Sequence, residues 1–95
     1  MTGYESLKSV LDAALAQAAQ GKGAERHANG LPFDAQPMAR ITEMVGVGFP
    51  LGQVLKKATE AKGMIDRGEY AAAERELLGA INYAAGAVLA IRGWE

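Results

Sequence analysis

The chain has 95 residues, enough for a single domain spanning residues 1–95. Hydrophobic residues make up 49% of it, which excludes wholesale disorder. Ten basic and eleven acidic residues leave a net charge of −1, which excludes nucleic-acid binding driven by a basic excess. The absence of cysteine excludes disulfides and thiolate metal sites.

Alanine dominates the hydrophobic fraction and aromatic residues are only 6% of the chain, so the expected core is thin. A small domain with a thin core is often stabilised by oligomerisation, and we therefore expect a homo-oligomer. The sequence shows no secretory signal and no apolar run of the roughly 20 residues that a membrane span needs. A cytoplasmic protein is the default expectation.

A first helix is predicted from about residue 3 to residue 20. Thr2 and Glu5 have the spacing of a capping box, and Gly21 follows the last residue of the apolar pattern. Residues 21–33 then contain three glycines and a proline, which predicts a loop.

The second and third helices are predicted from the capping residue, prolines and glycine that mark their limits. Asp34 is a candidate N-cap for a short second helix, with Pro37 in its first turn. Pro50 suits the start of a third helix, which runs towards Ile65 with Gly63 as a weak point or an early end. Asp66, Arg67 and Gly68 are expected to turn the chain into the last helix, with Asp66 as its cap.

The last helix, predicted over residues 69–92, is the longest and serves as the expected central strut. Its apolar stripe recurs at steps of four and three residues: Leu77, Ile81, Ala84, Val88 and Ile91. Its other positions are mostly alanine and glycine, which let other backbones approach closely. No strand-type alternation appears, so the predicted fold is all-α with four helices.

The spacing of small residues around residues 61–80 resembles one helix-turn-helix unit of tetratricopeptide repeats. The matching residues are Ala61, Met64, Gly68, Glu69, Tyr70, Ala73 and Ala80. Because such arrays need several units, a single match predicts only a C-terminal antiparallel helical hairpin and no peptide-binding groove.

Polar residues gather in the loop after the first helix and predict a site for a phosphate-bearing ligand. Lysine and arginine bind phosphate oxygens, glycines allow close backbone approach, and an aromatic ring stacks on a base. The predicted ligand-binding residues are Lys22, Arg26, His27, Asn29, Phe33, Lys57 and Asn82. The alternative is a solvated loop whose Asn29 and Gly30 form a turn.

Three of these residues have structural alternatives of their own. His27 is the sole histidine and suits a hydrogen-bonded structural role. Lys57 lies in a polar row on the third helix that local ion pairing explains. Asn82 lies beside the apolar stripe of the last helix, where it bonds a loop carbonyl, fixes a helix register across an oligomer interface, or reaches a ligand.

No metal site, cofactor or catalytic constellation is predicted. A lone histidine without neighbouring ligands does not suit zinc. The Gly-Lys-Gly sequence at residues 21–23 is not a Walker A loop. All-α nucleotide pyrophosphohydrolases hold magnesium through Glu-x-x-Glu and a later Glu-x-x-Asp, and this chain has neither. An enzyme is therefore the less favoured reading.

Several segments together resemble short bacteriophage proteins of the dATP/dGTP diphosphohydrolase-like type. The segments are Glu25-Arg26-His27-Ala28-Asn29-Gly30, Pro32-Phe33, Gln36-Pro37, Gly52-Gln53, Lys56-Lys57 and Glu76-Leu77-Leu78-Gly79-Ala80-Ile81-Asn82-Tyr83. The resemblance implies nucleotide handling in a phage setting, and departure from the acidic metal pattern favours binding without turnover.

The sequence thus leads to three hypotheses. The first is a small homo-oligomeric protein that binds a nucleotide or another phosphorylated ligand, sequestering it as a host defence signal, for example. The second is an interaction module that inhibits a host protein. The third is a nucleotide pyrophosphohydrolase-like enzyme. The ligand, the host partner, the oligomer number and the role of Trp94 are not readable from the sequence.

Overall fold

The computed structural model describes residues 2–20 and 30–93, and these residues form four α-helices and one short 3-10 helix. The elements are α1 (Glu5–Gln20), η2 (Phe33–Ala35), α2 (Pro37–Val45), α3 (Gly48–Asp66) and α4 (Tyr70–Gly93). No strand occurs among the described residues, so the predicted all-α class is confirmed.

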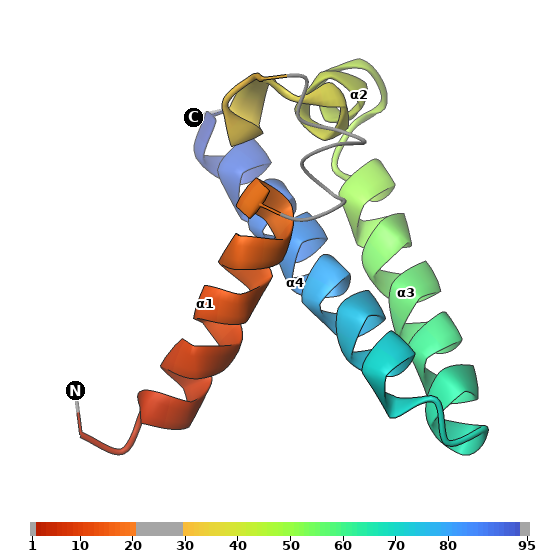
Figure 1. Cartoon of the computed structure of the whole chain (residues 1–95). Coiled ribbons are helices and arrows are strands. Elements are labelled where there is room, and N and C mark those ends of the chain that lie inside the picture. The colour runs from red at the N-terminus through yellow and green to blue at the C-terminus, as the bar shows by residue number, and fades with distance from the viewer. Residues whose placement is uncertain (1, 21–29, 94–95) are drawn as a thin grey trace.

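Helix α4 is the central element, as its small residues predict, because it contacts each of the other three α-helices. Figure 1 shows α3 and α4 side by side as an antiparallel pair, with α2 across one end and α1 diverging from the pair. The expected C-terminal hairpin is therefore present.

The N-terminal end of α1 differs slightly from the expected capping box. The Gly3 backbone N–H donates a hydrogen bond to Oε2 of Glu5 at 2.9 Å, and the helix itself begins at Glu5. Only Ala14 of this helix is buried. The apolar face predicted for this segment is consequently more exposed than that of a core helix.

Asp34 does not cap the second helix, contrary to expectation. It lies within η2, where the Ala35 N–H donates to the Pro32 carbonyl at 2.9 Å. Gln36 is the residue before α2 and has an extended backbone, with φ −76° and ψ 169°. Since a residue preceding proline disfavours the α conformation, Pro37 separates the two helical segments and takes the first position of α2.

Helix α3 is longer than predicted at both ends. It begins two residues before Pro50, which remains in the first turn, where its missing N–H has no helical partner to lose. Gly63 does not end the helix, because an interior glycine costs only about 1 kcal/mol relative to alanine. Ala61, 1% exposed, is buried two residues earlier, and the helix continues to Asp66.

The turn between α3 and α4 is a Schellman motif. Gly68 has φ +77°, and the Glu69 N–H donates to the Met64 carbonyl at 2.8 Å. Asp66 accepts a hydrogen bond from Nζ of Lys62 at 2.6 Å within α3. The chain therefore turns at Gly68, within the predicted segment, whereas the expected role of Asp66 as the cap of the last helix is wrong because Asp66 is the last residue of α3.

The core consists of small side chains, so the helices approach closely. The buried hydrophobic residues are Ala14, Ala61, Ala73, Ala80 and Ala87. On α4, the chain of Lys57 from α3 lies over Gly79, and Met38 from α2 lies against Gly86. A side chain at Gly86 would collide with the Met38 thioether.

None of the described helices combines the length and apolar character required to cross a membrane.

Candidate functional site: an apolar groove between α1 and α4

The structure describes three of the seven predicted ligand-binding residues and places two of them in one groove. Phe33 and Asn82 line this groove, whereas Lys57 does not. Lys22, Arg26, His27 and Asn29 lie outside the described residues.

The groove lies between α1, the segment around η2 and the second half of α4, and its volume is about 840 Å³. Helix α1 contributes Leu11, Leu15 and small residues. Helix α4 contributes Val88 and Leu89. Since these four side chains are between 38% and 66% exposed, they are available to a bound molecule.

Two side-chain amides bind α1 to α4 and thereby form the groove. Nδ2 of Asn82 donates to the Ala14 carbonyl at 3.0 Å, and Nε2 of Gln17 donates to the Arg75 carbonyl at 3.1 Å. The two bonds join the second half of α1 to the first half and the middle of α4, where the two helices cross. The half-buried amide of Asn82 therefore has a hydrogen-bond partner within the chain. That partner is a carbonyl of helix α1, whereas one of the predicted partners was a loop carbonyl.

The described lining includes three polar side chains, those of Gln36, Asn82 and Arg92. Gln36 already donates through Nε2 to the Leu31 carbonyl at 3.0 Å, which connects the segment before η2 to the start of α2. Arg92, near the end of α4, is the cation among the described lining residues. The sequence reasoning did not select Arg92, although a basic residue in the last turn of a helix beside a predicted site is a readable signal.

A smaller pocket of about 400 Å³ lies on the other side of Phe33 and Arg92, between α2 and the end of α4. Its lining adds the carboxylates of Asp34 and Glu43. Two carboxylates against one guanidinium make this pocket electrostatically unfavourable for a phosphate. The larger groove is the better candidate for an anionic ligand.

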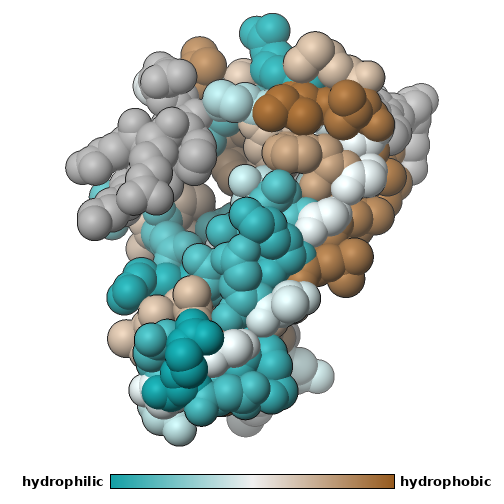
Figure 2. Space-filling model, turned by 90° about the vertical axis from the view of Figure 1, so that its right-hand side faces the viewer, coloured by the Kyte–Doolittle hydropathy of each residue, from teal (hydrophilic) through white to brown (hydrophobic). Residues whose placement is uncertain are grey.

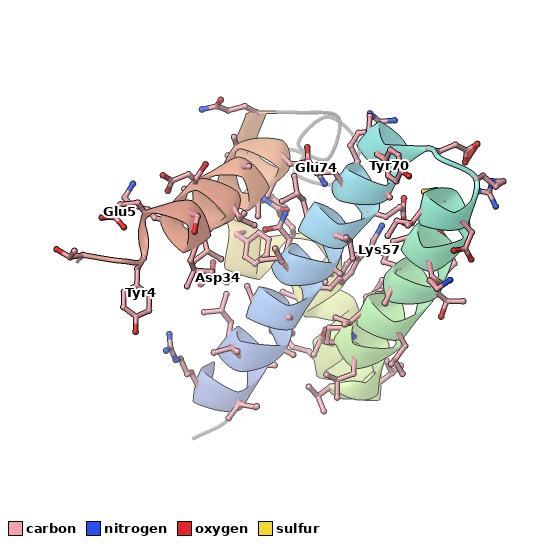
Figure 3. The ribbon with its side chains drawn as sticks, turned by 90° about the horizontal axis from the view of Figure 1, so that it is seen from below. Tyr4, Glu5, Asp34, Lys57, Tyr70 and Glu74 are labelled. Atoms are coloured by element: carbon pink, nitrogen blue, oxygen red, sulfur yellow. The ribbon has the colours of Figure 1, made fainter. Side chains whose placement is uncertain are left out.

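Lys57 extends from α3 towards α4, as Figure 3 shows. Its Nζ lies 3.7 Å from Oε2 of Glu76 and 5.7 Å from the ring centre of Tyr83. Tyr83 in turn packs edge-on against Phe49, with ring centres 6.1 Å apart. Both charged side chains are 24% exposed, so Lys57 takes part in the α3–α4 interface.

Three other ion pairs among the described residues have the i,i+4 spacing that helices favour, and Arg67 pairs with Glu69 at 2.9 Å in the turn before α4. Lys56 pairs with Glu60 one turn later on α3, as the polar row predicts. On α1, the hydrogen bond and charge of Asp12 raise the pKa of Lys8. Among residues 2–20 and 30–93, no three histidine or acidic side chains gather closely enough to hold a metal ion.

The exposed apolar side chains are the feature that helical periodicity alone did not locate. Sixteen large hydrophobic residues of the described segments are exposed, and four of them lie on α1: Leu7, Val10, Leu11 and Leu15. Figure 2 shows a second apolar area near the α2 end of the molecule, above a hydrophilic region. Met44, Val45, Leu51 and Leu55 are exposed in α2 and the first half of α3.

Comparison of the chain with protein-family models, curated proteins and solved structures gives no match.

Proposed function

We propose that this protein functions by binding, and that its groove between α1 and α4 receives the apolar face of an amphipathic helix from a protein. The single observation that carries this proposal is the groove itself, whose volume is about 840 Å³ and whose lining is apolar along both helices. This is the second of the sequence hypotheses, an interaction module.

The lining residues suit a helix. An amphipathic helix inserts side chains at steps of three and four residues into a groove between helices. Leu11 and Leu15 form one wall at that spacing, and Val88 and Leu89 form the other. Fully burying one such side chain contributes about 1.5–3 kcal/mol, so several partly exposed residues offer enough free energy to offset the ordering of a partner.

Site-specific photo-crosslinking tests this proposal. A photoreactive amino acid replaces Leu15 in the groove or, as a control, Lys56 on the polar face of α3, whose side chain is 67% exposed. The protein is then irradiated in the cells that make it. We expect a defined protein adduct from position 15 and none from position 56. Equal adducts from both positions, or none from position 15, would contradict the proposal.

A phosphorylated small molecule is the second candidate, because Phe33, Asn82 and Arg92 all line the same groove. The ring suits a base or sugar, the amide suits polar edges, and the guanidinium suits phosphate. This arrangement supports the nucleotide hypothesis through Arg92 in addition to the predicted residues.

Thermal unfolding against a panel of mono-, di-, tri- and cyclic nucleotides tests the second candidate. A ligand at a hundredfold excess over its Kd stabilises the folded state by about 2.7 kcal/mol. The shift should disappear in Arg92→Ala and persist in Arg40→Ala, which removes an exposed arginine of α2 that does not line the groove. If no nucleotide raises the melting temperature, the nucleotide candidate is refuted and only the protein-binding proposal remains.

A further inference from the structure

We propose that Met38 is a redox-sensitive contact, and that oxidation of its thioether by a peroxide releases α2 from α4. Three observations carry this proposal: the thioether lies directly against a buried glycine of α4, Met38 lines a pocket, and α2 is a short helix. Release of α2 is independent of what the groove between α1 and α4 binds.

The thioether of Met38 fills the place that a side chain of α4 would otherwise occupy. A Cβ atom at Gly86 would lie 2.6 Å from Cε of Met38 and closer still to Sδ. Gly86 is buried, so the thioether packs against the backbone of α4 itself. A thioether suits this place because it is apolar and adapts its shape to the available space.

The same side chain is accessible to a small oxidant. Met38 is half-buried and lines the pocket of about 400 Å³ between α2 and the end of α4. Hydrogen peroxide transfers one oxygen atom to the sulfur: a sulfur lone pair attacks one peroxide oxygen, the O–O bond breaks, and the second oxygen leaves as water. The sulfur is oxidised to a sulfoxide and the peroxide is reduced.

The sulfoxide does not suit the contact with Gly86. Its oxygen is a hydrogen-bond acceptor, and the N–H groups in the middle of α4 are already bonded within the helix. Because a buried acceptor without a donor is costly, the oxygen turns towards solvent and draws the side chain away from Gly86. The space left beside Gly86 is then a cavity, which lowers stability further.

Helix α2 depends on this contact because it is short. It spans nine residues, Pro37–Val45, and an isolated helix of that length is not stable in water. Its one buried residue, Thr42, donates its hydroxyl to the Met38 carbonyl at 2.7 Å, a bond within α2 that does not connect it to another element. We therefore expect α2 to loosen before the α3–α4 pair does.

Peroxide treatment of three proteins tests the proposal, with a control methionine on the same helix. Met44 is 75% exposed and should be oxidised first, without effect on stability. Met64 is also half-buried, so all three proteins carry Met64→Leu. The second protein adds Met38→Leu and the third adds Met44→Leu, because leucine nearly conserves the volume of methionine and has no sulfur to oxidise.

Peptide mass spectrometry locates the sulfoxides, circular dichroism measures the melting temperature, and amide hydrogen exchange reports on residues 37–45. Once Met38 is oxidised, the first and third proteins should lose about 5 °C of melting temperature and exchange faster in α2 than in α3. Met38→Leu should keep its melting temperature after the same treatment. Methionine sulfoxide reductases should restore the melting temperature of the other two proteins.

Three results would overturn the proposal: Met38 resists oxidation in the folded protein while Met44 is oxidised, the Met38 sulfoxide forms without loss of stability, or Met38→Leu loses as much as the others. If far-UV circular dichroism shows that Met38→Leu does not fold, the Met44→Leu protein decides. Recovery with the reductases and exchange confined to α2 then support the proposal. No recovery, or equal exchange in α2 and α3, overturns it.

Discussion

Substituting Lys57 and Glu76 separates a structural ion pair from a ligand-binding lysine. The perturbation is Lys57→Met and Glu76→Gln, made singly and together, because both changes remove charge and nearly preserve side-chain size. Nζ of Lys57 lies 3.7 Å from Oε2 of Glu76, a buried oxygen that has no hydrogen-bond partner. Removing the lysine alone should therefore be the most costly change, because it leaves this carboxylate without its counter-charge.

The expected magnitude follows from the distance and the exposure. Two unit charges at this separation attract by about 1.1 kcal/mol in bulk water and about 4.5 kcal/mol at an effective dielectric constant of 20. Both side chains retain 24% exposure, and their desolvation offsets most of the attraction. We expect a coupling free energy of about 1 kcal/mol, with the double variant less destabilised than the sum of the singles.

Urea unfolding followed by circular dichroism, at one fixed protein concentration, measures the four free energies of the cycle. The control is the same cycle at Lys56 and Glu60, an exposed pair at 3.5 Å on one helix. The control coupling should be about 0.3–0.5 kcal/mol. A Lys57–Glu76 coupling no larger than the control would refute the argument that this ion pair stabilises the α3–α4 interface.

Three further predictions concern one hydrogen bond, one turn and the pKa of one lysine. Asn82→Ala should lower the free energy of unfolding by about 1 kcal/mol, because it removes the hydrogen bond to the Ala14 carbonyl. Urea unfolding measures this free energy, and an unchanged value would contradict a stabilising role for the hydrogen bond. Gly68→Ala should cost about 1–2 kcal/mol because φ is +77°, and an unchanged melting temperature would contradict this conformation. Asp12→Asn should lower the pKa of Lys8, observable by NMR titration; in the parent, the raised pKa makes its stabilisation fade as the pH rises through the folded-state value.

The positions of the helices were largely predictable because helix signals are local. The last helix was predicted over residues 69–92 and spans Tyr70–Gly93, and the chain turns at Gly68 within the predicted turn. The misplaced N-cap at Asp34 was also a local matter. Pro37 restricts Gln36 to an extended backbone, and this restriction outweighs the capping preference of Asp34 two residues earlier.

The candidate site was less predictable because its residues come together only through helix packing. Phe33 and Asn82 were selected separately and share one groove, whereas Arg92 completes the described lining without having been selected. Lys57 was associated with the loop site, but Glu76 on the neighbouring helix holds it at the α3–α4 interface. A charged residue on a helix has several possible partners, and the sequence does not rank them.

By itself, the sequence determined an all-α chain, the approximate limits of its helices and the central role of α4, which contacts the other three α-helices. Tertiary structure alone decided which apolar faces are covered. Helix formation depends on hydrogen bonds between residues four apart, which periodicity and capping residues reveal. The pairing of faces depends on contacts between distant segments, and the alanines and glycines of α4 permit close approach on several sides. That is why the stripe of α1 is recognisable in the sequence, while its exposure beside a groove is visible only in the folded chain.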